Sequence, residues 1–484
     1  MTKRPHIVTL WTYLSRFFFL LIFPILQAIF LAPFSEVAWS SLPSVVGIVG
    51  IAYFQYLSCG YGVTAVEENG RSLSILYWKS GLFFQKQKIL PADCVASVFL
   101  RLNPILDLFG AAQVMLDSPA ANAKKPSLTL LLPKKAPLLW WQQLREEISH
   151  RYAASSIRVV LMAISWSNPA SGLLLIGILF NRASKILGDE LTQRLYGIYD
   201  NVNQTERLMA WGLPPTVAIV GWLMALGWFC AFLVQFFRYA FFTAGVCPTG
   251  TMISRGMIFR SRQLLTNQAI RAVAIRQTLM MRLFHLSSVY LHTIGSGKEK
   301  GDRSLLMAAA TTPELRHHLA RFYPKESPYF FSREGMSVIR PSKNSLFSFL
   351  LSPLLNAGGI LVLYLLFVRY LPLFSPLILF LFAFPLYYLL LRLAAYRNTF
   401  LAEDSTHITA CGYIKDQLFT AVVPKRAVQI VVIRQNPFQK RSGRCQVRLC
   451  IGTEKGACFD LRHFRLSDIE KFRFVPEESE SKQL

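Results

Sequence analysis

The chain is short of acidic residues and of charged residues in general. Its 484 residues include 27 Asp and Glu against 52 Lys and Arg, and only 16% of all residues are charged. Average soluble domains carry about 25% charged residues, so this composition argues against a protein that is soluble throughout. The net charge of +25 predicts attraction to anionic surfaces, and membrane headgroups are the favoured partner over nucleic acid.

The chain also lacks the residue constellations that carry catalysis or hold metals. No Ser-His-Asp set and no paired catalytic carboxylates stand out, and His317-His318 has no further ligand at metal spacing. The run from Gly295 to Lys298 is not a phosphate-binding loop, because Glu299 follows the lysine where Ser or Thr is needed. We therefore expect a protein that is not an enzyme and that has no cofactor and no metal.

The cysteines form no CxxC pair. Three of the eight cluster at Cys445, Cys450 and Cys458, on residues that alternate as in strands. Scattered cysteines in a basic chain with no secretory signal predict reduced thiols in the cytosol.

The chain contains several long apolar runs. They cover residues 17–31, 38–57, 159–180, 211–237, 346–368 and 371–391. A bilayer core about 30 Å thick needs about 20 apolar helical residues, and most of these runs reach or approach that length. The sequence predicts six transmembrane helices in three hairpins; the alternative for any one run is a buried helix of a soluble fold.

Basic residues predict how these helices are oriented. Lys3, Arg4 and Arg16 precede the first run, whereas the short loop after it carries only Glu36. Positive segments stay in the cytoplasm, so we expect both termini and every soluble stretch on the cytoplasmic side. Residues 181–210 are predicted to form an amphipathic helix in the membrane interface.

The soluble stretches repeat one another. Two prolines 13 residues apart, and a glycine 6 residues after the second, occur at Pro91, Pro104 and Gly110 and again at Pro424, Pro437 and Gly443. The middle stretch has the same spacing in divergent form, with Thr266, Leu279 and His285 at these positions. An arginine lies three residues before the second mark in each copy, at Arg101, Arg276 and Arg434. We infer three copies of one module.

Each copy has the pattern of an antiparallel β-fold closed by a helix. The pair Asn69-Gly70 separates two runs rich in apolar and aromatic residues, which is a strong hairpin signal. Short amphipathic helices are expected at residues 138–148, 313–322 and 467–472. Several strands and one closing helix predict a sandwich or barrel capped at one end.

The repeated segments resemble a known family. The first copy reads "GLFFQKQKILP…RLNPILDLFGAAQV", and the later copies echo it as "GMIFRSRQLLT…RQTLMMRLFHLSSV" and "GYIKDQLFTAVVP…RQNPFQKRSGRCQV". With the order of spans and domains, this resembles the bacterial membrane proteins with bacterial pleckstrin-homology-like (bPH2) domains, the YdbT/YdbS group. The resemblance implies a seven-stranded, strongly bent sheet closed by a C-terminal helix, no catalytic residues, and a place in the bacterial plasma membrane.

The predicted fold class is thus a multi-domain membrane protein with six transmembrane helices in three hairpins and three PH-like sandwich or barrel domains, each closed by a C-terminal helix. The predicted boundaries are 1–58 for hairpin 1, 59–157 for domain 1, 158–238 for hairpin 2, 239–345 for the divergent domain 2, 346–392 for hairpin 3 and 393–484 for domain 3.

Seven basic residues are candidates for binding anions. The recurring Arg101, Arg276 and Arg434 suit phosphate or carboxylate, because the planar guanidinium binds either group through two hydrogen bonds. Further basic residues next to aromatic ones could dock on an anionic leaflet, and these are Lys86, Lys88, Arg260 and Arg262. The alternatives are a local ion pair for the recurring arginines and, for the others, a solvated edge strand on which lysine blocks unwanted pairing.

Together these features favour a non-enzymatic membrane scaffold that presents three cytoplasmic modules. Its expected partners are the lipid bilayer and its anionic headgroups, and a protein partner or further copies of the chain, but no nucleic acid. The alternative function is a transporter or lipid-handling protein in which the helices work and the modules regulate them. The near absence of charges inside the apolar runs argues against ion coupling.

Overall fold

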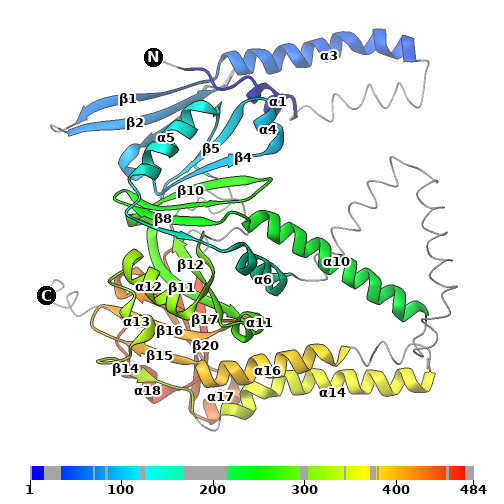
Figure 1. Ribbon diagram of the computed structural model, residues 1–484, viewed down its shortest axis with the longest axis vertical. Helices are drawn as coiled ribbons and strands as arrows, with labels where there is room; N and C mark the ends of the chain where they lie inside the picture. Colours follow the sequence, from blue (N-terminus) through cyan, green and yellow to red (C-terminus); the bar gives the residue numbers. More distant parts are fainter. Residues whose placement is uncertain are drawn as a thin grey trace.

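The computed structural model describes residues 3–15, 34–68, 71–81, 85–119, 126–167, 215–294, 304–342, 345–370, 378, 381–453 and 457–474. Its strands follow one another along the long axis of the molecule, in three groups that correspond to the three copies (Figure 1). Four helices, α3 (Phe34–Leu57), α10 (Pro215–Tyr239), α14 (Leu346–Tyr370) and α16 (Ala383–Asn398), extend from the same side of this column of strands.

The first copy contributes two groups of three strands. The first group is β1 (Gly60–Glu68), β2 (Arg71–Ser80) and β3 (Lys86–Pro91), and the second is β4 (Ser97–Leu102), β5 (Ala111–Asp117) and β6 (Leu128–Pro133). Glu68 pairs with Arg71, which confirms the hairpin predicted around Asn69-Gly70. The short helix α1 (Thr9–Leu14) packs against α3 through Tyr13, Ala52 and Cys59.

The second and third copies each have four strands followed by three. In the second copy these are β7 (His150–Ala153), β8 (Thr243–Cys247), β9 (Gly250–Arg255) and β10 (Arg260–Thr266), then β11 (Ile270–Thr278), β12 (Leu286–Thr293) and β13 (Ser304–Thr311). In the third they are β14 (Ser337–Ile339), β15 (Phe400–Glu403), β16 (His407–Ile414) and β17 (Gln417–Pro424), then β18 (Val428–Arg434), β19 (Arg444–Ile451) and β20 (Cys458–Arg465).

The spacing of the sequence marks has a local structural cause. The first mark ends a strand and is followed by a 3-10 turn, η2 (Ala92–Cys94), η3 (Asn267–Ala269) or η6 (Lys425–Ala427). The second mark is the first residue of a short helix, α4 (Pro104–Leu108), α11 (Leu279–Leu283) or α17 (Pro437–Arg441). The third mark has positive φ, +68° at Gly110, +54° at His285 and +61° at Gly443. The middle copy thus keeps the backbone geometry although its residue types differ.

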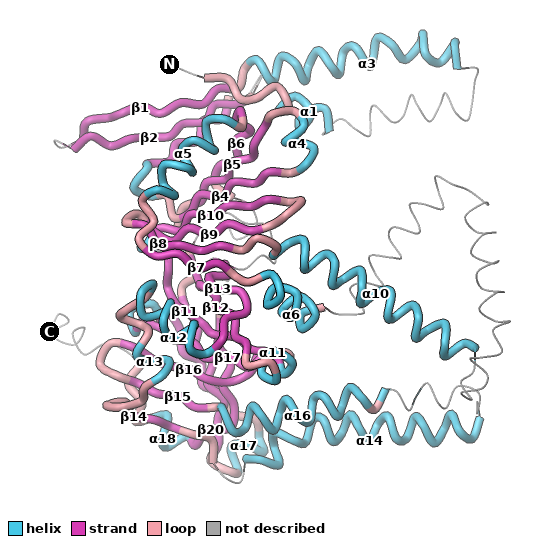
Figure 2. The backbone as a smooth tube through the Cα atoms, in the orientation of Figure 1, coloured by secondary structure: helices cyan, strands magenta, loops and turns pink. Residues whose placement is uncertain are grey.

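Strand pairing joins neighbouring copies. The four sheets have the orders β1-β2-β3, β6-β5-β4-β10-β9-β8-β7, β13-β12-β11-β17-β16-β15-β14 and β18-β19-β20. Strand β4 of the first copy pairs with β10 of the second, and β11 of the second pairs with β17 of the third. We call these pairings the first and the second junction. Figure 2 shows the resulting continuous column of strands.

The predicted fold class is therefore wrong in two respects. The strands do not form three separate domains, each with its own bent sheet, because each seven-stranded sheet takes strands from two copies. Local sequence patterns predict where strands form but not which strands pair between copies. The unpaired edges of β4 and β11 need a partner strand, and the next copy provides it.

Six transmembrane helices in three hairpins are not found either. Within the described ranges only two helices are long and apolar enough to cross a membrane, over Trp222–Tyr239 in α10 and Leu346–Tyr370 in α14. Among the described residues, the shorter apolar helices cover Val45–Leu57 of α3 and α6 (Ser156–Trp166), and α16 has 16 residues, whereas about 20 are needed to span a bilayer. Residues 17–31, and the predicted interfacial segment 181–210, lie outside the described residues.

Closing helices cover the sheets near the predicted positions. They are α5 (Lys135–Glu146), α12 (Thr312–Phe322) and α18 (Leu466–Glu470). Helix α5 of the first copy packs on the sheet of the second, where Trp141 and Leu144 meet Cys247, Met252 and Leu264. The closing helix therefore strengthens a junction as well as its own copy.

The prediction that all cysteines are reduced is wrong for one pair. Cys450 and Cys458 face each other across β19 and β20 and form a disulfide. The other six cysteines are free thiols, and of these only Cys94 is exposed. The alternating pattern did indicate strands here, but the partner of each cysteine depends on register, which the sequence pattern does not specify.

Candidate functional site

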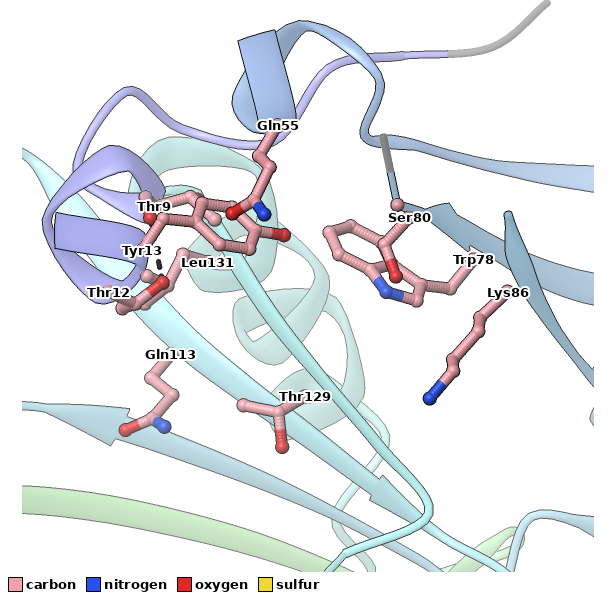
Figure 3. A pocket seen from close by; sticks show the side chains of 11 residues that line it. Thr9, Thr12, Tyr13, Gln55, Trp78, Ser80, Lys86, Gln113, Thr129 and Leu131 are labelled. Carbon is pink, nitrogen blue, oxygen red and sulfur yellow. Dashed lines mark hydrogen bonds between the residues drawn. The ribbon is translucent and has the colours of Figure 1, made fainter. Parts of the chain in front are cut away.

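A polar cavity of about 420 Å³ lies in the first copy, at the foot of α3. It is lined by Thr9, Thr12 and Tyr13 of α1, Gln55 of α3, Trp78, Ser80, Gly81 and Lys86 around the β2–β3 hairpin, and Gln113, Thr129 and Leu131 of β5 and β6. Figure 3 shows these side chains converging on one space from the two strand groups and the two helices. The cavity is therefore enclosed by segments far apart in the sequence.

Local structure explains how the β2–β3 side of this cavity forms. Gly81 follows β2 with φ of +125°, a conformation that suits glycine and turns the chain toward β3. Lys86 then pairs with Ser80 at the turn end of the hairpin. The ammonium group of Lys86 points toward the cavity beside Trp78 (Figure 3).

Two polar atoms in the wall are buried without a hydrogen bond among the described residues. They are Oγ1 of Thr9 and Oε1 of Gln55. A buried polar atom without a partner costs about 1–3 kcal/mol, so a bound polar molecule that reaches these atoms would be stabilised. The lysine favours an anionic group, and the Trp78 ring offers an apolar wall.

The described residues that line this cavity include no carboxylate, imidazole or thiol. It can therefore bind and orient a polar ligand but provides none of the usual groups for proton transfer near neutral pH. Across the described part of the chain, no three His, Cys, Asp or Glu side chains lie together as a metal site would need.

The recurring arginines occupy equivalent backbone positions in different surroundings. Arg101 pairs with Ser261 at the first junction, and its Nε donates to Oδ1 of Asn103 over 3.0 Å. Arg276, only 6% exposed, lies opposite Phe419 at the second junction, with its Cζ 5.2 Å from the centre of the Tyr290 ring. The structure does not bring the three arginines to one site.

Arg434 differs from the other two because its strand has a free edge. Among the described strands, β18 pairs only with β19, and Arg434 is exposed. At the opposite end of the column, β3 has a mostly exposed face and, within the same described set, pairs only with β2. The two free edges are those that, in the other copies, form the junctions.

The other predicted basic residues lie on β3 and β10. Lys88 donates from Nζ to the carbonyl oxygen of Ser127 over 2.8 Å, so part of its role is structural. Arg260 is exposed and pairs with Leu102. Arg262 is half-buried, and its Cζ lies 5.8 Å from the centre of the Trp141 ring. Only Lys86 lines the cavity in the first copy.

Sequence reasoning missed most of this cavity. Thr9, Gln55 and Gln113 belong to a short N-terminal helix, a long apolar helix and a central strand, and no motif links them. The signal that could have found the site is the repeat itself, because β3 corresponds to the junction strands β10 and β17 but pairs only with β2 among the described strands.

The search of curated proteins and the search of solved structures each found no match to this chain. Residues 208–322 match a family model described as Bacterial PH domain. The match includes α10, the strands β8 to β13 and α12, which is the copy whose sequence marks have diverged most. The second copy of this chain is therefore similar to bacterial PH domains.

Proposed function

We propose that the chain is a non-enzymatic scaffold, anchored in a membrane, whose joined copies form one basic column beside the bilayer. The observation that supports this most is the exposure of α10 and α14. Trp222, Phe347 and Leu355 are 66–67% exposed on these helices, and both helices leave the column on the same side (Figure 1).

Exposed apolar helices of this length need a partner. The buried share of the apolar window is 17% in α10 and 6% in α14, so neither is a core helix of the described fold. Each exposed apolar Å² costs about 25 cal/mol in water, and a lipid core removes this cost along the whole helix. One membrane could accept both helices because they point the same way.

The proposed location is the cytoplasmic face of a bacterial plasma membrane, in a protein of the YdbT/YdbS group. The excess of basic residues supports this, because anionic lipids attract Lys and Arg near the surface by about 1 kcal/mol each. The cavity at the foot of α3 lies next to a helix on the membrane side, and Lys86 in its wall suits an anionic headgroup.

The free edges favour a protein partner over end-to-end association of the chain. If β18 of one molecule paired with β3 of another in the register of the junctions, Arg434 would lie opposite Lys86, since these residues correspond to Arg101 and Ser261. Like charges directly opposite one another destabilise a strand pair. An extended segment with acidic side chains would instead complement either edge.

A labelling experiment tests the anchoring and the orientation together. The protein should sediment with membranes and resist extraction by alkaline carbonate but not by detergent. Cys94 should react with a membrane-impermeant maleimide only after the cells are lysed, because it is the exposed free thiol of the cytoplasmic column. The Cys94→Ser variant is the matched control for background labelling.

Two results would contradict the proposal. Release of the protein by carbonate would mean that α10 and α14 do not span a bilayer. Labelling of Cys94 in intact cells would place the first copy outside the cytoplasm.

A further inference from the structure

A second cavity, of about 400 Å³, lies beside the first junction and is rich in arginine. The last turn of α5 contributes Arg145, while β7 contributes Arg151 and β10 contributes Arg262. The other described residues that line it are neutral, so none of them is a carboxylate.

The strand register explains why two of these arginines meet. Arg262 pairs with Ser254, which pairs with Thr243, while Arg151 pairs with Gly245, two residues further along β8. Directly paired residues share a face, and so do residues two apart on a strand, so both guanidinium groups rise from the same face of the sheet. That face is the one on which α5 packs through Trp141 and Leu144.

Gly245 lets the chain after α5 approach the floor of this cavity. A Cβ atom added there would lie 2.8 Å from Cγ2 of Ile148 and 3.2 Å from the carbonyl oxygen of His150. Both distances are closer than ordinary contacts, so a larger residue would push α5 and its arginine away from the sheet.

The positive charges of this cavity are not neutralised within the described chain. None of Arg145, Arg151 and Arg262 forms an ion pair or a side-chain hydrogen bond with another described residue. Glu146 and Glu147 follow Arg145 on the chain but do not line the cavity. Burial, and then the charges of Arg145 and Arg260, lower the pKa of Arg262, so its positive charge is less stabilised here than in water.

We propose that this cavity is a binding site for a phosphate group, formed jointly by the first and second copies. Three guanidinium groups suit a phosphate monoester or diester, because each can donate two hydrogen bonds to its oxygens. The hydroxyls of Thr243 and Ser254 lie in the same wall as further donors. Trp141, Phe242 and Met252 provide an apolar side that could cover the organic part of the ligand.

The second junction does not repeat this site, although its strand register is the same. Val338 corresponds to Arg151, because it pairs with Ala402 of β15 as Arg151 pairs with Gly245 of β8. Thr420 corresponds to Arg262, because it pairs with Cys411 of β16 as Arg262 pairs with Ser254 of β9. The phosphate site therefore depends on side chains particular to the first junction and not on the module as such.

The test uses the full chain purified in detergent and titrated calorimetrically with inorganic phosphate. Wild-type protein should bind phosphate, and the double variant Arg151→Gln/Arg262→Gln should bind it at least about tenfold more weakly, because two charge-assisted bonds are lost. Ala153→Glu should have a similar effect by placing a carboxylate in the cavity with all arginines intact. Arg321→Gln is the matched control, since Arg321 lies in the last turn of the corresponding helix α12.

A parallel titration with nanodiscs distinguishes a free phosphate from a lipid headgroup. Binding to phosphatidylglycerol nanodiscs over phosphatidylcholine nanodiscs, lost in the double variant, identifies a lipid source even where inorganic phosphate is weak. Absence of binding in both titrations, or binding that the double variant and Ala153→Glu leave unchanged, overturns the proposal. Because the phosphate titration needs no bilayer, its failure would leave membrane anchoring untouched.

Discussion

The two junctions pair their strands in one register but have different side chains beside the shared strands. Arg101 faces Ser261 at the first junction, and the corresponding Arg276 faces Phe419 at the second. The first junction has an open cavity with three arginines and no carboxylate. At the second, Tyr329 of α13 (Pro328–Phe331) donates to Oδ2 of Asp404 over 2.9 Å, and Lys425 pairs with Glu403 over 3.3 Å.

The two junctions therefore share their backbone hydrogen bonds between strands but differ in the side chains around them. At both junctions, the open edge of one copy pairs with the last strand of the four-stranded group of the next copy, so the same hydrogen-bonding pattern occurs twice. Once that pattern is met, residues such as Arg262 and Thr420 at equivalent positions are free to differ. We infer that the junctions share a structural role and that only the first has gained a binding role.

The largest expected effect comes from a charge placed inside the shared strands. Leu264 and Val422 are equivalent positions at the two junctions, 6% and 0% exposed. Leu264→Asp and Val422→Asp should each lower the free energy of unfolding by roughly 3–5 kcal/mol, because an uncompensated charge is buried. Chemical denaturation of the detergent-solubilised protein measures this change.

Ile89 provides the matched control for these two variants. It is the equivalent residue on β3, whose outer edge is free, and it is 60% exposed. Ile89→Asp should change stability by no more than about 0.5 kcal/mol. A loss as large as that of Leu264→Asp would mean that β3 also has a pairing partner in the folded protein.

The next effect concerns the ion pair beside the second junction. The side chains of Lys425 and Glu403 are only 4% and 14% exposed. Glu403→Gln should destabilise the protein by about 3 kcal/mol, because it leaves a buried ammonium without its counter-charge. The double variant Glu403→Gln/Lys425→Met should recover most of the stability lost in Glu403→Gln. If the double variant is as unstable as the single one, the carboxylate of Glu403 stabilises the protein through other contacts, such as the hydrogen bond that it accepts from the backbone N–H of Arg473.

The sequence predicted the repeat and many of the strands, because both leave local marks. Gly110 and Gly443 mark a positive φ, and Pro104 and Pro437 each begin a short helix, so their spacing reports real backbone geometry. The joining of the copies leaves no such mark, since pairing between β4 and β10 depends on edges that meet only in space. The apolar runs predicted more membrane-spanning helices than the two found within the described ranges, and for the run over residues 159–180 only the part up to residue 167 is described.

The candidate sites were predicted only in part, for the same reason. Lys86 and Arg262 stood out because they lie in basic, aromatic segments. Arg145 and Trp141 did not, because they belong to a closing helix that packs on the sheet of the next copy, and Arg151 did not, because it lies on a short strand that no motif marks.

Acid should lower the stability of the second copy, which takes part in both junctions. The contact responsible joins α6 to α12 and lies outside both junctions. Arg158 of α6 forms a hydrogen-bonded ion pair with Glu314 of α12, and this bond lowers the pKa of Glu314. A carboxyl with a depressed folded-state pKa stabilises the protein above its unfolded pKa, near 4.5, and this stability is lost as the pH falls through the folded value. The loss should be below about 1 kcal/mol, because both side chains are about one-third exposed.

Thermal melting between pH 6 and pH 3 measures that contribution. Glu314→Gln should flatten the acid limb of the curve relative to wild type, whereas Arg262→Gln should leave it unchanged. An identical acid limb in wild type and Glu314→Gln would assign the acid sensitivity to other carboxylates.

The smallest expected effect on stability is the most direct test of the difference between the two junctions. Without phosphate, Arg262→Gln should change stability by no more than about 0.5 kcal/mol, and in the stabilising direction, because it relieves repulsion from Arg145 and Arg260. With phosphate, wild type should gain stability in proportion to the logarithm of ligand concentration above its Kd, and the variant should need a higher phosphate concentration for the same gain. Thr420→Gln, at the equivalent position of the second junction, should leave the phosphate dependence of stability as it is in wild type. If Arg262→Gln melts at a lower temperature than wild type in phosphate-free buffer, Arg262 stabilises the junction itself, for example through its contact with Trp141. Arg262 would then have a structural role as well as a binding role, and the proposed difference between the two junctions would not hold at this residue.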